Sequence, residues 1–363
     1  MRWRPIVGWW LAHGVLVAAA ALVAFPTAHG SGAHLGAALD RWGVWQDDAV
    51  NYAHVAFQGY TASPAWPAYW PGVPLLIVLT RSPWITLAVV QVALLAVMRL
   101  MATVAMDLGL SASAALTAVA LFALNPAAVY YSSAYPELWV VGGFLLAIWA
   151  TLHRRPWPMA VGIGVATIMD PLGAVVGLLP LLLAIQSWRR RDKPGLAAGL
   201  AGVAAGGLVV LGFCGYLAAT VGNPLAMVAA QRSWVGTWTL PWAQVLQVVR
   251  GTAPARAATN EWGAIFFVAF AVSGIASLAA RARRRPSGAM GMVVIVAAVV
   301  ALVGLSFSAD RVPMLSTGRF MSLDAPIYLG VATMNRLRIA ALVGGGLIGF
   351  VGAIAFTHGY FWW

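Results

Sequence analysis

The stretch AMGMVVIVAAVVALVGLSFS, residues 289–308, decides the fold class of this chain, because it runs without a single charged side chain. An α-helix of about 20 apolar residues is long enough to cross the hydrocarbon core of a bilayer. Comparable runs recur along the sequence, so we predict an all-α polytopic integral membrane protein with about 11 transmembrane helices. The predicted spans are 6–26, 84–106, 112–131, 136–152, 158–170, 172–186, 196–219, 261–280, 289–308, 319–335 and 339–357, of which 158–170 and 172–186 are short.

The overall composition supports a membrane protein. Hydrophobic residues make up 61% of the 363 positions and charged residues 9%, whereas a soluble domain carries about 25% charged residues. The mean hydropathy is +0.83. These values argue against a soluble enzyme, a disordered protein and a DNA-binding module. Cys214 is the one cysteine, which excludes an internal disulfide and a zinc site built on cysteines.

The basic residues are distributed as membrane topology predicts. With the N-terminus in the cytoplasm, the basic clusters fall on alternate connections between the spans, as the positive-inside rule requires. The net charge of +12 is therefore explained by basic residues on the cytoplasmic connections, and we expect no nucleic-acid partner. We predict a multi-pass protein of the bacterial plasma membrane with two long external loops, 27–83 and 220–260. The clusters are Arg2/Arg4, Arg154/Arg155, Arg189–Arg191 with Lys193, Arg281/Arg283–Arg285, and Arg336/Arg338.

The first external loop contains a pair of adjacent carboxylates, Asp47 and Asp48. The residues from Asp48 to Ala56 are patterned as a short amphipathic helix, and Gly59 is suited to end it as a C-terminal cap. Two neighbouring carboxylates beside an apolar, tryptophan-rich surface repel each other, which raises the pKa of one of them. A general base needs such an environment, so either Asp47 or Asp48 is a candidate.

Four stretches in order along the chain resemble the GT-C glycosyltransferases, most of all the PIG-V group, the mannosyltransferases of GPI assembly, and their bacterial relatives. The first is Asp48-x-x-x-Tyr52-x-x-x-Ala56-x-x-Gly59-Tyr60, followed by Trp66-Pro67-Ala68-Tyr69. The others are Asn125-Pro126 through Tyr135-Pro-Glu137, Gly222-Asn223-Pro224 through Gln231, Trp234 and Pro241-Trp242, and Gly318-Arg319-Phe320 through Pro326. Departures are Asp47 where the group usually has Trp, Asn223 in place of Asp, and Val235, which interrupts a Trp-Gly pair.

The resemblance implies one GT-C transmembrane domain over residues 1–363 and an inverting transfer of a hexose, expected to be mannose. The implied donor is a polyprenyl-phosphate sugar, and the acceptor is a lipid-linked or glycan alcohol on the external face. Asp48 takes the catalytic position, with Asp47 as its rival. Arg319 is the first candidate to bind the donor phosphate and Arg232 the second. The expected substrate-binding residues are Tyr52, His54, Tyr60, Tyr69, Tyr135, Glu137, Gln231 and Trp234.

No cofactor or metal is expected, because the sequence has no DxD motif, glycine-rich phosphate loop or histidine cluster. Two other function classes stay open. A lipid or solute transporter would also contain broken helices and intramembrane acids, and a non-catalytic partner subunit would account for the departures from the family pattern. The acceptor, the identity of the sugar and the oligomeric state are left open.

Overall fold

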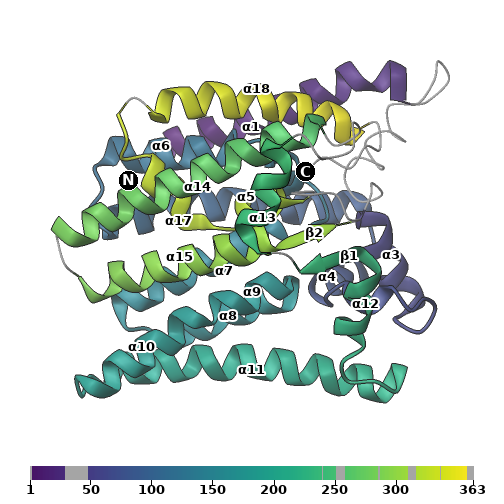
Figure 1. Ribbon diagram of the computed structural model, residues 1–363, viewed down its shortest axis with the longest axis horizontal. Coiled ribbons are helices and arrows are strands. Elements are labelled where there is room, and N and C mark those ends of the chain that lie inside the picture. Colours follow the sequence, from purple (N-terminus) through teal and green to yellow (C-terminus); the bar gives the residue numbers. More distant parts are fainter. Residues whose placement is uncertain are drawn as a thin grey trace.

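A computed structural model describes residues 2–28, 48–238, 240–250, 258–284, 287–309, 316–335 and 337–357. Long helices lie side by side along one direction, and the short helices α3, α4 and α12 gather at one end (Figure 1). The helices are α1 (Arg4–Ala28), α3 (Asp48–Gln58), α4 (Gly72–Thr80), α5 (Pro83–Asp107), α6 (Ala112–Ala123), α7 (Glu137–His153), α8 (Pro156–Met169), α9 (Pro171–Val176), α10 (Leu178–Arg189), α11 (Lys193–Val221), α12 (Ala226–Trp234), α13 (Pro241–Val249), α14 (Ala258–Arg284), α15 (Gly288–Ser306), α16 (Thr317–Ser322), α17 (Ala325–Val331) and α18 (Leu337–Thr357). Two 3₁₀ turns, η1 (Trp66–Ala68) and η2 (Ala128–Ser132), and two strands, β1 (Val235–Trp238) and β2 (Phe307–Ala309), complete the described elements.

The chain is a helical membrane protein by the length and composition of its helices. Among the described residues, seven helical stretches are long and apolar enough to cross a membrane. Large apolar side chains on these helices point outward: Val92 is 71% exposed, Leu208 71% and Val272 62%. Such a surface matches lipid, since the bilayer interior replaces water as the surrounding solvent. The seven stretches are Arg4–Val23, Pro83–Asp107, Pro171–Arg189, Lys193–Val221, Ala264–Arg284, Gly288–Ser306 and Leu337–Phe356.

The remaining predicted spans are shorter helices or are divided. Ala112–Ala123, Glu137–His153 and Pro156–Met169 are apolar but have fewer than 18 residues. The predicted span 319–335 instead forms α16 and α17, separated at Leu323 and Asp324. Pro326 lies in the first turn of α17, where it has no N–H to donate to the carbonyl of Ser322 and so does not continue α16. Residues of both short helices are buried inside the protein.

Glycines allow several helices to approach each other at backbone distance. A Cβ on Gly274 of α14 would lie 2.5 Å from the carbonyl oxygen of Ile327 in α17, and one on Gly330 would collide with the backbone of Gly274. A Cβ on Gly162 of α8 would lie 2.7 Å from the carbonyl oxygen of Gly143 in α7. Small residues at such crossings are typical of helix packing in membranes, where van der Waals contact drives association.

Polar contacts join the connections that carry the basic clusters. Arg154 lies 3.3 Å from Asp192, and His153 lies 3.7 Å from Asp107. Arg281 donates to the carbonyl oxygen of Gly109 at 2.5 Å. The ends of α5, α7, α10 and α14 therefore meet at one end of the bundle, at the left in Figure 1, opposite α3, α4 and α12. Arg154, Arg189 and Arg281, from three of the basic clusters, therefore lie at this end.

The described part of the second loop, 220–260, is partly folded onto the bundle. Strand β1 pairs in antiparallel fashion with β2, with Val235 opposite Ala309 and Trp238 opposite Phe307. This pair joins the end of α12 to the end of α15. It was not expected from the sequence, which predicted helices alone. Helix α3 agrees with the short helix predicted in the first loop, and α12 and α13 are two short helices of the second loop.

Candidate functional site

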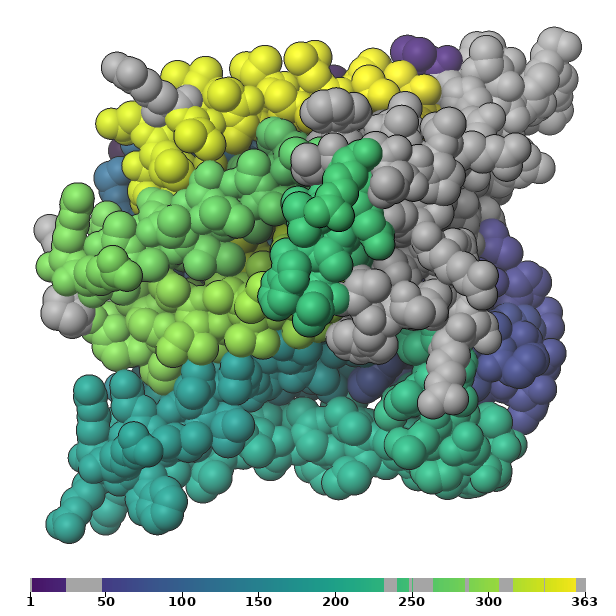
Figure 2. All heavy atoms as spheres, viewed as in Figure 1, coloured from purple at the N-terminus to yellow at the C-terminus, as the bar shows by residue number. Residues whose placement is uncertain are grey.

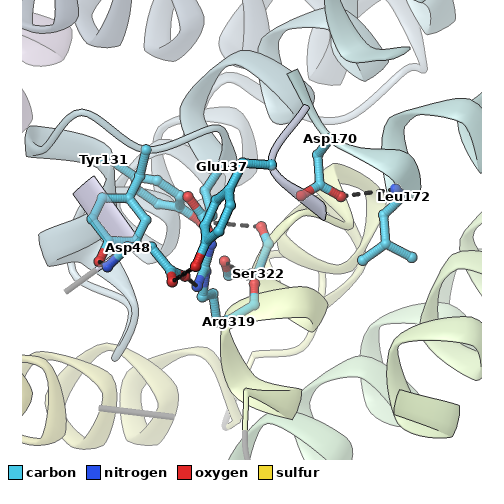
Figure 3. A network of polar contacts seen from close by, with 9 residues as sticks. Asp48, Tyr131, Glu137, Asp170, Leu172, Arg319 and Ser322 are labelled. Atoms are coloured by element: carbon cyan, nitrogen blue, oxygen red, sulfur yellow. Dashed lines mark hydrogen bonds and ion pairs between the residues drawn. The ribbon is translucent and has the colours of Figure 1, made fainter. Parts of the chain in front are cut away.

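An ion cluster of Asp48, Glu137 and Arg319 lies at the end of the bundle that carries α3 and α4. Arg319 Nη1 donates to Asp48 Oδ2 at 2.5 Å, and Arg319 Nε donates to Glu137 Oε1. The three residues come from α16, α3 and α7, and Figure 3 shows both carboxylates turned toward the guanidinium. One cation thus serves two anions, so the cluster has a formal charge of −1.

The three members of the ion cluster differ in their access to solvent. The side chains of Glu137 and Arg319 are 1% and 5% exposed, whereas that of Asp48 is 19% exposed. The guanidinium also lies over the rings of Tyr135 and Tyr130, 4.9 and 5.4 Å from the ring centroids. Arg319 is therefore held by charges and by two aromatic faces. Asp48 is the member that a substrate reaches most easily.

Asp48 is held by two further groups. The Tyr69 hydroxyl donates to Asp48 Oδ1 at 3.1 Å, and Asn51 Nδ2 donates to the Tyr69 hydroxyl oxygen at 2.8 Å. The backbone N–H of Asp48 donates to the Tyr135 hydroxyl oxygen at 3.1 Å. From the described residues, each carboxylate oxygen accepts one hydrogen bond, which leaves lone pairs for another donor.

The Tyr69 hydroxyl remains a donor across the physiological pH range. Burial raises the pKa of Tyr69, and the charge of Asp48 and the hydrogen bond to it raise it further. Burial likewise raises the pKa of Tyr52, whose ring lies edge-on to that of Tyr69 with centroids 5.0 Å apart. Both phenols stay neutral, so neither competes with Asp48 as a base.

Local sequence explains why the two carboxylates lie where they do. Asp48 is in the first turn of α3 and Glu137 in the first turn of α7, where the positive end of the helix dipole favours an anion. Gly59 ends α3 with φ +75°, and its N–H donates to the Val55 carbonyl. The predicted amphipathic helix and its glycine cap are confirmed. Pro136 occupies the N-cap position of α7.

Two of the predicted substrate-binding residues, Tyr60 and Gln231, form no hydrogen bond with Asp48 among the described contacts and instead hold the backbone next to Tyr69. The Tyr60 hydroxyl donates to the Tyr69 carbonyl at 2.9 Å, and Gln231 Nε2 donates to the Ala68 carbonyl at 3.3 Å. Both contacts fix the segment that carries Tyr69. His54 is exposed, accepts from Gln58 at 3.1 Å and stacks on Trp66 at 5.7 Å. These contacts hold His54 on the outer side of α3.

Asp47, the rival catalytic residue, lies outside the described residues. Arg232 and Trp234 belong to α12, whose backbone is described there, but their side chains are not. The predictions for these three residues stay predictions.

Two residues of the site were not among the predicted ones, Asn51 and Tyr130. Asn51 follows Asp48 by three positions, so helical periodicity would have placed it on the same face of α3. Tyr130 lies in η2 and has no local signal that connects it with Arg319. Two further polar side chains stabilise turns. Asn125, just after α6, accepts from the N–H of Ala127 at 2.8 Å, and Asp170 caps α9 by accepting from the N–H of Leu172 at 2.8 Å.

An apolar groove adjoins the site between α3, α4 and α11. Its volume is about 490 Å³, and its walls include Val55, Leu75, Ile168 and Leu208. Tyr60 also lines it and, through its bond to the Tyr69 carbonyl, connects it with the surroundings of Asp48. In the described part of the chain, no three His, Cys, Asp or Glu side chains are grouped so that they would hold a metal ion.

Comparison with known proteins gives no match: no protein-family model and no curated protein is similar to the chain.

Proposed function

We propose that the protein is an inverting glycosyltransferase that moves a hexose, expected to be mannose, from a polyprenyl-phosphate sugar to an alcohol of a lipid-linked or glycan acceptor. The observation that carries this proposal is the partly exposed carboxylate of Asp48. It is oriented by Arg319 and Tyr69 and lies at the end of the bundle away from the basic clusters. By the positive-inside rule, that end faces the exterior of a bacterial plasma membrane.

The proposed reaction needs one protein base. The acceptor oxygen attacks the anomeric carbon as the bond from that carbon to the phosphate oxygen breaks, and Asp48 takes the hydroxyl proton. The polyprenyl phosphate leaves with the electron pair. Its phosphate is a stable anion, so no general acid has to protonate it, in contrast to glycoside hydrolysis, where two carboxylates share the work.

Arg319 has a positioning role in this proposal. Its charge is already matched by two carboxylates, and the carboxylate of Asp48 is fixed by its Nη1. Guanidinium groups also bind phosphate oxygens bidentately. Binding of the donor phosphate at Arg319 would therefore replace the contact to Asp48 and release that carboxylate to accept the proton of the acceptor.

The apolar groove supports a lipid-linked donor. A polyprenyl chain is hydrocarbon, and a groove that opens between lipid-facing helices buries it without desolvating polar groups. Tyr60 lines the groove and donates to the carbonyl of Tyr69, whose hydroxyl donates to Asp48, so the side chain of Tyr69 links the groove with the carboxylate. We propose that the isoprenoid part of the donor occupies the groove.

Transfer from defined donors tests the function. The purified chain in lipid vesicles should transfer labelled mannose from polyprenyl-phosphate mannose to added acceptor lipid extract, and GDP-mannose should not replace this donor. Excess EDTA should leave the rate unchanged, because the proposed mechanism uses no metal. Transfer from GDP-mannose without a lipid-linked donor, or no transfer from either donor, would contradict the proposal.

Filling the groove should weaken the use of long-chain donors. A Cβ on Gly212 would meet no atom within 4 Å, and this residue lines the groove. We expect Gly212→Leu to raise KM for a long-chain polyprenyl donor by roughly 10-fold, as expected when ~1.4 kcal/mol of apolar contact is lost. A donor with a short prenyl chain should be affected little.

Gly215→Leu is the matched control, since Gly215 also has no neighbour within 4 Å and does not line the groove. Its KM should stay within about 2-fold of that of the unmodified protein for both donors. Equal effects of the two substitutions, or an equal effect of Gly212→Leu on both donors, would remove the groove from the proposal.

A further inference from the structure

A second groove lies at the opposite end of the bundle, between α10 and α15. Its volume is about 370 Å³. The apolar part of its wall is formed by Leu182, Ile185, Met292 and Ile295, and the polar part by Gln186, Arg189 and Arg190. In Figure 2 α10 (teal) and α15 (light green) border each other at the left-hand end of the molecule.

The charges around this second groove are positive. Arg189 and Arg190 are exposed, and in the described part of the chain neither has a carboxylate within ion-pair distance. The acidic groups at this end are engaged elsewhere, Asp192 with Arg154 at 3.3 Å and Asp107 with His153 at 3.7 Å. The two guanidinium groups are thus available to a ligand.

The end of the groove next to α15 adds further donors. A Cβ on Gly288 would lie 2.5 Å from Gln186 Nε2, so the glycine gives the amide of Gln186 room over the first turn of α15. This helix has 19 residues, and its N-terminus carries a partial positive charge that favours an anion. Gln186 and the two arginines line the groove, and the first turn of α15 adjoins it where Gln186 approaches Gly288.

The depth of the groove in the membrane is indicated by two exposed tryptophans. Trp188 of α10 is 75% exposed and Trp157 of α8 is 77% exposed. Tryptophan is enriched where the lipid headgroups meet the hydrocarbon. The arginines of the groove therefore lie at the level of the headgroups, and its apolar wall continues toward the acyl chains.

We propose that this groove binds an anionic phospholipid. One acyl chain lies along Leu182, Ile185 and Met292, and the headgroup phosphate is bound by Arg189 and Arg190. A zwitterionic lipid would bring its own cation next to two guanidinium groups, which disfavours it. Basic pockets between transmembrane helices are suited to anionic headgroups. Each basic residue contributes a several-fold gain in affinity, about 1 kcal/mol.

Lipid retention by the purified full-length chain tests this proposal. The protein is exposed to equal amounts of phosphatidylglycerol and phosphatidylcholine in detergent, and retained lipid is quantified by mass spectrometry. We expect roughly 10-fold preferential retention of phosphatidylglycerol, which the double substitution Arg189→Gln/Arg190→Gln should abolish. Equal retention of the two lipids by the unmodified protein would overturn the proposal.

The matched control is Arg283→Gln/Arg284→Gln, which removes the same charge from the end of α14 at the same end of the bundle. It should leave the preference within about 2-fold. A third variant, Met292→Trp, fills the groove without changing its charge and should also reduce retention. If the control pair lowers retention as much as the groove pair, or if Met292→Trp retains lipid fully while its unfolding midpoint is unchanged, the groove is not the site.

Discussion

Asp48→Asn should lower the rate of sugar transfer by roughly 10²–10⁴-fold, the range associated with loss of a general base. Asparagine keeps the shape of the side chain and an oxygen that accepts from Tyr69 or Arg319, but its amide does not take a proton from the acceptor. Because the side chain of Asp48 is 19% exposed, we expect a modest cost in stability. The rate is measured with polyprenyl-phosphate mannose in vesicles, and the unfolding midpoint in detergent.

Asp107→Asn is the matched control, because Asp107 lies at the opposite end of the bundle and pairs only with the His153 side chain among its described contacts. It should transfer at the rate of the unmodified protein. Asp47→Asn decides between the rival bases. Loss of transfer in Asp47→Asn with transfer retained in Asp48→Asn would move the catalytic role to Asp47, and retention in both would exclude a base at this position.

The local features of the fold are predictable from the sequence because they depend on neighbouring residues. The cap of α3 at Gly59 follows from a glycine placed after an amphipathic run, and the helix does end there with φ +75°. The predicted span 112–131 is instead broken after Ala123, close to Pro126, which lacks a helical donor. Charge-free runs such as 289–308 likewise predict candidate spanning helices, since a helix of about 20 apolar residues is long enough to cross a bilayer.

Hydropathy does not predict membrane spans correctly where an apolar segment is buried inside the protein and not in lipid. Residues 319–335 are apolar enough to be predicted as a span, but they form α16 and α17, which pack inside the bundle. An apolar stretch does not reveal whether its neighbours are acyl chains or other helices. Pro326 lies in the first turn of α17, and Asp324, which precedes that helix, is fully buried.

The sequence predicts the members of the ion cluster as separate candidates and does not predict their contacts with one another. Arg319 is separated by 271 positions from Asp48 and by 182 from Glu137. No periodicity spans such distances, so the sequence marks each residue as a candidate without showing that one arginine serves both carboxylates. The pairing of β1 with β2 escapes prediction for the same reason, since its two segments are remote and short.

Arg319→Gln should destabilise the protein by about 3–5 kcal/mol, the cost associated with removing one partner of a buried ion pair. The effect depends on Glu137, whose side chain is 1% exposed. Its Oε1 accepts from Arg319, and its Oε2 has no hydrogen-bond partner among the described residues. Without the guanidinium, a buried carboxylate would be left without compensation. The free energy of unfolding in detergent measures the loss.

A double-substitution cycle separates this structural role of Arg319 from its role in transfer. Arg319→Gln/Glu137→Gln removes both the cation and the buried anion, so it should regain at least about half of the stability lost in Arg319→Gln alone. Transfer should stay low in the double variant, because it still lacks the guanidinium that orients Asp48 before the donor binds and that then binds the donor phosphate. Arg319→Lys should recover little transfer, since an ammonium is a point charge and does not present the planar fork that contacts two carboxylates. Additive losses of stability in the cycle would show that Arg319 and Glu137 do not depend on each other. Recovery of transfer together with stability would show that Arg319 acts on the fold alone and does not position Asp48.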